Sequence, residues 1–467
     1  MLYALEFAEI YQDKMMVCKK RREKMLIIGN GIVLTFDKNS RVISNGGVVI
    51  EEENVVAIGK TEKLTSKYPD AEYKDVQGKI IMPGMINTHM HLYSTFARGM
   101  DLKTDQSPKN FVEILEKLWW RLDKVLNEED IYCSAIYALL DCVKKGTTTI
   151  FDHHASSNLI DGSLDIITEA VRQSGIRANL SYEISDRDGH EKALDGIREN
   201  ARFIKKVQQE GNNYLGGMIG LHASFTLNNE TLSEAAALAD ELEVPFHIHV
   251  AEGIADFYES KTRGYKGVAE RLNRFHILRP GTLAIHGVHL QEEELEILKN
   301  NDSYLIHNPE SNMGNAVGAA PIKAAMGKGV TVGLGTDGYT TDMFESIKVA
   351  NLLQKHELHN PQAGWEEVFQ MVFENNREIA ARFFDKTLGV LQTGAPADII
   401  VVNYYPPTPI TSENAYFHIL FGVSGDMVDT TIVGGNILME DREISGLDYE
   451  RIIRRVKEQA EDFWKRF

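Results

Sequence analysis

The chain is poor in cysteine and has no long apolar run. Its three cysteines are Cys18, Cys133 and Cys142. None of them belongs to a CxxC pair and three cannot all pair within one chain, which argues against a disulfide scaffold and predicts a reducing, cytoplasmic location. No apolar run reaches the roughly 20 residues that a membrane-spanning helix needs, so we expect no membrane partner.

The chain also has fewer basic than acidic residues. The 50 Lys and Arg residues are outnumbered by 68 Asp and Glu residues, which gives a formal net charge of −18. A field of that sign repels polyanions, so we expect no nucleic-acid partner. Hydrophobic residues make up 43% of the 467 residues, which is typical of a globular protein. This length allows either a few domains or one large barrel with an appendage.

Short strand patterns occupy both ends of the chain. Residues 1–24 read as an N-terminal extension. Their acidic residues precede the basic ones, which is the wrong order for a signal peptide. Residues 25–78 and 386–446 show short apolar runs separated by Gly and Asn, which is typical of strands and hairpins. We expect the two segments to form one small β-sandwich domain, followed by a C-terminal helix over 447–467.

The middle of the chain, residues 79–385, alternates short apolar or β-branched runs with longer helical patterns, such as the amphipathic stretch 111–145. Such alternation predicts parallel strands joined by helices, and eight units predict a (β/α)₈ TIM barrel. The eight runs cover residues 84–91, 147–154, 177–184, 218–224, 245–252, 282–288, 303–308 and 331–337. Seven of them carry a His or Asp at or near their end, which is the active-site rim of such barrels.

Three of these strand ends suggest a metal site. His89 and His91 lie two residues apart in the first predicted strand, so their side chains point the same way and can bind one divalent ion. His249 on the fifth strand and Asp337 after the eighth are further candidate ligands. His247 shares a face with His249 and remains an alternative. Imidazole and carboxylate ligands suit Zn²⁺, with Fe²⁺ or Mn²⁺ as alternatives.

Other polar residues at the strand ends have two readings each. Glu183 and Arg187 follow the third strand and either contact a substrate or belong to a solvated loop. Asn308 either contacts a substrate or shapes a loop beside the pocket. The cluster of Asp152, His153 and His154 is expected to form structural hydrogen bonds rather than to bind metal.

Six segments together resemble a known family. They are PGMINTHMHLYSTFARG (83–99), GTTTIFD (146–152), FHIHVAE (246–252), LAIHGVHL (283–290), HNPESNM (307–313) and GLGTDG (333–338). They resemble the aminohydrolase/chlorohydrolase branch of the amidohydrolase superfamily, and within it the SsnA-type putative aminohydrolases. The resemblance runs from about residue 25 to 441.

The resemblance implies roles for individual residues. The metal ligands would be His89, His91, His249 and Asp337. Glu252 would shuttle protons, His286 would orient the metal-activated water, His222 would contact the substrate, and Asp337 would also accept a proton. The fourth strand carries His222 and no lysine, which favours one metal ion over a lysine-bridged pair.

The implied activity is hydrolytic deamination of a small aminated heterocycle, such as a purine, pterin or pyrimidine, with release of ammonia. A bound divalent ion lowers the pKa of water from 15.7 to about 7, which makes a nucleophile available at neutral pH. Two alternatives remain open: hydrolytic dechlorination of a triazine-like ring, and a catalytically silent accessory role in selenium or molybdenum-enzyme metabolism. The family also suggests a homodimer.

Overall fold

The computed structural model describes residues 25–467, so the predicted extension at residues 1–24 lies outside the described residues. The chain divides into two compact units. Apart from residues 1–24, the smaller unit comprises residues 25–85, 143–148 and 386–449, and the larger comprises 86–142, 149–385 and 450–467. No helix in the described part of the chain is long and apolar enough to cross a membrane.

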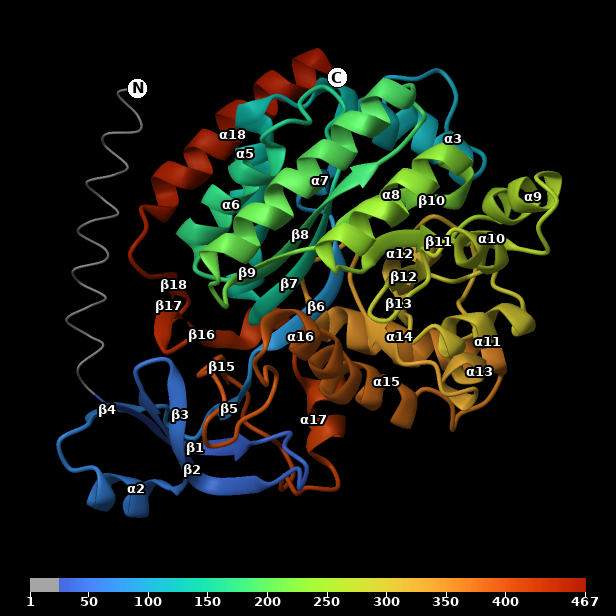
Figure 1. The fold of residues 1–467 in the computed structure, drawn as a ribbon. Coiled ribbons are helices and arrows are strands. Elements are labelled where there is room, and N and C mark those ends of the chain that lie inside the picture. The colour runs from blue at the N-terminus through green and yellow to red at the C-terminus, as the bar shows by residue number, and fades with distance from the viewer. Residues whose placement is uncertain (1–24) are drawn as a thin grey trace. The chain divides into compact units, whose positions relative to one another are not determined.

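The parallel strands of the barrel confirm the predicted TIM-barrel fold (Figure 1). They are β6 (Met85–Met90), β7 (Thr147–His154), β8 (Arg177–Ile184), β10 (Ile219–Ala223), β11 (Phe246–Val250), β12 (Leu283–His286), β13 (Tyr304–His307) and β14 (Val332–Leu334). Each strand pairs with the next in this order, and the short β9 (Leu215–Gly217) pairs beside β8. A parallel bridge between Met90 and Asp337 brings the first and last strands together.

Every one of these eight strands is buried along its whole length. Parallel strands covered by helices read as continuous apolar runs for this reason. The main helices between and after them are α5 (Glu128–Lys144), α6 (Ser163–Ser174), α7 (His190–Glu210), α8 (Asn229–Leu242), α9 (Ile254–Thr262), α10 (Val268–Arg274), α11 (Glu292–Asn300), α14 (Met343–Leu358) and α16 (Asn376–Phe384). Shorter helices fill the loops: α12 (Pro309–Gly314), α13 (Ile322–Gly327) and α15 (Glu366–Gln370).

The helical pattern over residues 111–145 is not one helix. It forms α3 (Phe111–Ile114), a π-helical turn at Leu115–Trp119, and α4 (Trp120–Val125), before α5 begins at Glu128. Leu126 leaves the helical conformation with ψ of 127°, and Asn127 accepts a hydrogen bond from the backbone N–H of Asp130, which starts the next helix.

The smaller unit contains one mixed sheet built from both ends of its described chain. In spatial order its strands are β18 (Glu443–Ile444), β17 (Asn436–Glu440), β16 (Val428–Val433), β15 (Ile399–Val402), β5 (Ile80–Pro83), β1 (Leu26–Leu34), β2 (Val42–Glu51) and β3 (Asn54–Lys60), with β4 (Glu72–Asp75) beside β1. Side chains from both segments, including Ile28, Val48, Ile81, Ile399 and Ile432, form its core. On the other face, Ile27 and Val49 pack with Leu64 of α2 (Thr61–Lys67), because side chains alternate between the two faces of a strand.

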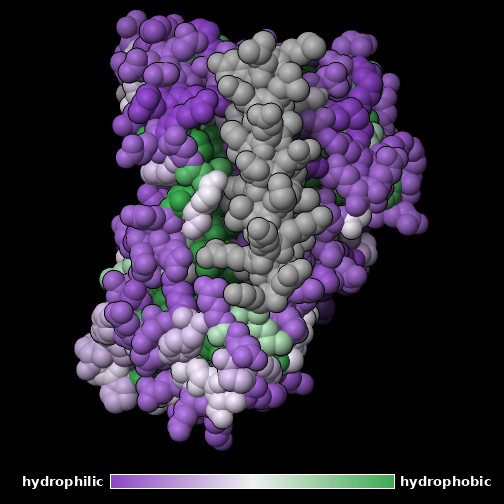
Figure 2. Space-filling view, turned by 90° about the vertical axis from the view of Figure 1, so that its left-hand side faces the viewer, coloured by the Kyte–Doolittle hydropathy of each residue, from purple (hydrophilic) through white to green (hydrophobic). Residues whose placement is uncertain are grey.

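The face of the molecule shown in Figure 2 is mainly hydrophilic where its residues are described. That agrees with a quarter of the chain being charged. Apolar surface on this face is confined to a narrow band and small patches. Single exposed apolar side chains are ordinary in globular proteins and carry no functional argument.

The C-terminal helix α18 (Tyr449–Arg466) belongs to the barrel unit from residue 450 onward. Its Arg466 forms a two-pronged ion pair with Asp130 of α5, with Nη2–Oδ distances of 2.7 and 2.8 Å. Gln459 donates a third hydrogen bond to the same carboxylate. Asp130 is fully buried, so its charge depends on these partners.

Replacing Arg466 by alanine should therefore destabilise the barrel unit by about 2–3 kcal/mol, because it strips a buried carboxylate of its cation. Thermal unfolding of Arg466→Ala beside wild type measures this as a lower midpoint. Lys465→Ala, which removes a neighbouring charge without such a pair, is the matched control. Equal midpoints for the two variants would contradict the prediction.

Candidate functional site

The C-terminal ends of the barrel strands place the predicted site residues on one rim. His89 lies in β6 and His91 follows that strand; His249 lies in β11, His286 ends β12, and Asp337 follows β14. Because parallel strands end on the same side of a barrel, residues separated by up to 248 positions meet there. All five side chains are buried or nearly so.

Four of these side chains converge on one small volume. The Nε2 atoms of His91 and His249 are 3.3 Å apart. Asp337 Oδ1 lies 3.3 Å from His91 Nε2 and 3.9 Å from His89 Nε2. The structure thus brings together the four residues that the sequence predicts as a ligand set.

In His91 and His249, the hydrogen bond made by Nδ1 shows that Nε2 is the ring nitrogen that faces this volume. His91 Nδ1 lies 2.5 Å from the carbonyl oxygen of His153, and His249 Nδ1 lies 2.9 Å from that of His222. A carbonyl oxygen only accepts, so each Nδ1 carries the proton and each Nε2 carries a lone pair. Two lone pairs 3.3 Å apart repel each other unless a cation lies between them.

His247 makes different contacts from His249. Its Nε2 lies 2.8 Å from Nδ1 of His89, and its Nδ1 lies 3.4 Å from the hydroxyl of Ser181. It therefore contacts the rear of His89, whose Nε2 has no hydrogen-bond partner among the described residues. Burial and neighbouring imidazoles hold the pKa of His89 and of His249 well below its usual value, which keeps both rings neutral and able to bind a cation.

The predicted proton-transfer groups lie against this cluster. His286 Nε2 is 3.4 Å from Glu252 Oε2 and 3.4 Å from Asp337 Oδ2. His286 Nδ1 donates to Asn312 Oδ1 at 2.8 Å, which turns Nε2 toward the site. Burial raises the pKa of Glu252 well above its usual value, and the nearby Asp337 raises it further. Burial also raises the pKa of Asp337, but His91 and His286 more than offset that effect.

The two carboxyl groups therefore differ in protonation. Glu252 favours its neutral form and can donate a proton, whereas Asp337 favours its charged form and can accept one. Asn315 Nδ2 donates to Glu252 Oε1 at 3.3 Å, which holds the carboxyl group in place. Paired carboxyl groups with opposed pKa shifts are a common arrangement for acid and base roles.

The predicted substrate-contact residues fall into two groups. His222 and Glu183 lie close to the cluster, with His222 Nε2 3.7 Å from Glu183 Oε1. His222 also borders a small cavity shared with His249 and Glu252. Burial raises the pKa of Glu183 to about 8.

Arg187 and Asn308 are engaged elsewhere. The Arg187 guanidinium forms a buried ion pair with Asp123 of α4. Asn308 is fully buried, and a Cβ at Gly335 would meet its Oδ1 at 2.6 Å. Its position fits the packing between β13 and β14 rather than an open pocket.

Sequence reasoning missed two features of this site. His153 lies in the cluster: its ligand-type nitrogen is within 4.8 Å of those of His89, His91 and His249. The His residues at the end of the second strand were the sequence signal that could have identified His153 as part of the cluster, although we expected them to form structural hydrogen bonds. Asp123 carried no signal, because a carboxylate on a helical pattern usually faces solvent.

A second cavity of about 300 Å³ leads to the cluster from the loops after β6 and β14. His91 and Asp337 line it, together with Trp119, Arg98 and Tyr339. It gives a small molecule a polar and aromatic surface next to the cluster.

Comparisons with known proteins agree with this geometry. The Amidohydrolase family pattern matches residues 80–438. The 5'-deoxyadenosine deaminase of Methanosarcina mazei is 33% identical over 445 residues, covering 94% of this chain and 98% of that protein. The 5-methylthioadenosine/S-adenosylhomocysteine deaminase of Carboxydothermus hydrogenoformans is 32% identical, covering 92% and 96%.

Solved structures show the same fold at lower identity. A zinc-bound adenosine deaminase from Xanthomonas campestris superposes with a TM-score of 0.82 at 20% identity, covering 95% of this chain and 99% of that one. A zinc complex of the atrazine chlorohydrolase TrzN from Arthrobacter aurescens gives 0.76 at 22% identity, covering 93% and 100%. The resemblance to the aminohydrolase/chlorohydrolase branch is thereby confirmed, and the chain belongs to the amidohydrolase family.

Proposed function

We propose that this protein is a metal-dependent aminohydrolase that deaminates a small aminated heterocycle, with a purine nucleoside of the 5'-deoxyadenosine type as substrate. One observation carries the proposal: three imidazoles and Asp337 converge beside the buried carboxyl group of Glu252. Relatives named as deaminases of 5'-deoxyadenosine and 5-methylthioadenosine support the substrate class.

The residues fit a single divalent ion held by His89, His91, His249 and Asp337. The fit rests on the two Nε2 lone pairs 3.3 Å apart, whose Nδ1 protons are fixed by backbone carbonyls. Nitrogen and oxygen ligands of this kind favour Zn²⁺, and the zinc-bound neighbours support that choice. When bound, such an ion supplies the nucleophile by lowering the pKa of water to about 7.

The chain's own residues supply the proton transfers. Glu252 donates a proton to the ring nitrogen next to the amino-bearing carbon, which makes that carbon more electrophilic. Asp337 accepts the proton released by the attacking water, and His286, held by Asn312, stabilises the oxygen that develops negative charge. The proton that Asp337 accepts then passes to the amino group, which leaves as ammonia, and the hydroxyl of the tetrahedral carbon returns a proton to Glu252 as the carbonyl product forms.

Substrate contacts are proposed for His222 and Glu183, which lie beside the cluster. Arg187 and Asn308 are proposed to act behind the pocket as positioning residues: Arg187 pairs with Asp123, and Asn308 packs against Gly335. A homodimer stays a prediction from the family resemblance, and light scattering on the purified protein measures it.

The test is ammonia release from zinc-loaded protein supplied with 5'-deoxyadenosine, 5'-methylthioadenosine, adenosine or guanine. We expect release with at least one of the nucleosides and its loss after treatment with a chelator. A chlorinated triazine, assayed for chloride, tests the alternative chemistry. Chloride release without any ammonia release, or silence of metal-replete protein across the whole panel, would contradict the proposal.

Replacing Glu183 by glutamine should weaken substrate binding more than chemistry. The amide has the same shape, but an NH2 group replaces one of the two carboxyl oxygens of Glu183, one of which faces His222. We expect KM to rise about tenfold with kcat changed much less, because a buried hydrogen bond to a charged or strongly polar group contributes about 1.5–3 kcal/mol. Steady-state kinetics measure both constants, and Glu191→Gln, on α7 outside the site, is the control. A fall confined to kcat would contradict the assignment.

A further inference from the structure

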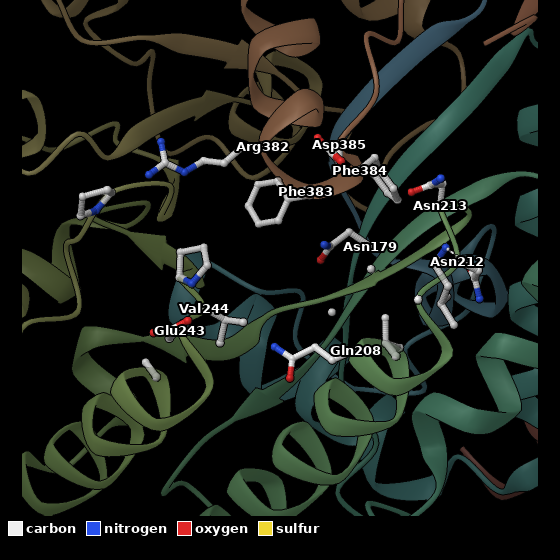
Figure 3. Close-up of a pocket in the computed structure, with 18 of the residues that line it drawn as sticks. Asn179, Gln208, Asn212, Asn213, Glu243, Val244, Arg382, Phe383, Phe384 and Asp385 are labelled. Carbon is white, nitrogen blue, oxygen red and sulfur yellow. Dashed lines mark hydrogen bonds between the residues drawn. The ribbon is translucent and has the colours of Figure 1, made fainter. Parts of the chain in front are cut away.

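A cavity of the barrel unit (Figure 3) lies at the opposite end of the barrel strands from the metal-type cluster. Its volume is about 650 Å³, within the range of small-molecule sites. It lies beside the N-terminal ends of the strands, where Asn179 of β8, Gly216 of β9 and Pro245 before β11 line it. Nothing in the proposed deamination uses this cavity.

A buried amide forms the floor of this cavity. Asn179 is 1% exposed, and neither its Nδ2 nor its Oδ1 has a hydrogen-bond partner among the described residues. In Figure 3 its side chain points into the space between Phe383, Val244 and Gln208. A buried primary amide left without partners is costly, by about 1–3 kcal/mol per group, so a ligand that pairs with both atoms gains that free energy.

A glycine, Gly216, packs directly against this amide. A Cβ on Gly216 would lie 2.6 Å from Asn179 Nδ2, closer than real contacts allow. Around the amide, Val207, Leu215 and Phe383 give the cavity apolar walls. An amide floor between apolar walls suits a flat molecule that presents an adjacent donor and acceptor.

The charges around the cavity exclude an anionic ligand. Helices α7, α8 and α16 all end here, and the residues that follow them, Gly211, Glu243 and Asp385, line the cavity. Helix C-termini carry partial negative charge. The two arginines at the rim are already paired, Arg279 with Asp240 at 2.8 Å and Arg382 with Asp302 at 3.1 Å.

We infer that this cavity is a second, non-catalytic binding site for an uncharged, aminated planar heterocycle. Asn179 Oδ1 accepts from the amino group of the ring while Nδ2 donates to the neighbouring ring nitrogen, the two-point pairing that asparagine makes with the N6 and N7 edge of adenine. The inference rests on the cavity alone and is independent of the proposed deamination.

The test is calorimetric titration with adenine of the full-length, metal-loaded protein, in a Glu252→Gln background that suppresses turnover. Gln208→Trp fills the cavity from an exposed position on α7, and Gln209→Trp places the same side chain on the next, non-lining position. We expect adenine to bind at least about tenfold more weakly to the Gln208→Trp protein than to the Gln209→Trp protein. Asn179→Leu should weaken it by a similar factor.

Two further ligands test the chemistry of the site. Hypoxanthine carries an oxygen in place of the amino group, so it should bind about tenfold more weakly than adenine to this cavity. Adenosine monophosphate, which adds a dianion to the same ring, should also bind more weakly. Equal adenine affinities for the Gln208→Trp and Gln209→Trp proteins, or adenine binding undetectable at millimolar concentration, would overturn the inference.

Discussion

Replacing His249 by alanine is expected to lower the bound zinc to a small fraction of one ion per chain and to reduce kcat/KM for deamination at least about 10³-fold. His249 Nε2 lies 3.3 Å from His91 Nε2, and each of these nitrogens carries a lone pair directed into the site. His249 Nδ1 is held by the His222 carbonyl. Without it the ion loses a ligand, and the metal contributes several kcal/mol to the rate. Elemental analysis and ammonia release measure the two effects on the same sample.

A histidine outside the site controls for the general effects of this substitution. His356 is exposed on α14, and His356→Ala should retain full zinc content and activity. His247→Ala separates the two histidines of β11: it removes a partner of His89 and not a proposed ligand, so we expect a loss of about 10–100-fold in metal affinity. Unchanged zinc content in His249→Ala protein would refute the ligand set.

Replacing Glu252 by glutamine should reduce kcat by about 10²–10⁴-fold while zinc content stays near wild type. The amide retains the shape of the side chain but cannot transfer a proton, and general acid–base catalysis contributes a factor of this size. Glu252 Oε2 lies 3.4 Å from His286 Nε2, next to the cluster but outside the proposed ligand set. Retained metal with lost turnover separates a proton-transfer role from a ligand role.

The control for this variant is Glu259→Gln, on α9, where the carboxylate pairs with Arg263. It makes the same Glu-to-Gln replacement a few residues along the chain, and we expect its kcat to match that of wild type. A Glu252→Gln protein with wild-type kcat would exclude Glu252 as the acid. Loss of zinc from the Glu252→Gln protein would indicate that the Glu252 carboxyl group belongs to the metal site.

The alternation of apolar runs and helical patterns determined the barrel. The segments predicted at residues 147–154 and 177–184 form β7 and β8 with the same bounds, because β-branched, aromatic and aliphatic residues set them apart from the helical patterns beside them. The position of His89, His91 and Asp337 at strand ends was readable for the same reason. The break of residues 111–145 at Leu126 was missed although the sequence carries a local signal for it, because Asn127 and Asp130 have the spacing of a helix cap.

Only the tertiary structure decided which side chains meet and which atom of each faces inward. The period-two rule places His247 and His249 on one face of β11, but the His222 carbonyl and the ring of His89 orient them differently. His153 joined the cluster, Arg187 turned to Asp123, and the unpaired amide of Asn179 came to face a cavity at the other end of the barrel. Sequence periodicity records burial along one element, whereas these outcomes depend on distances of about 3 Å between elements far apart in the chain.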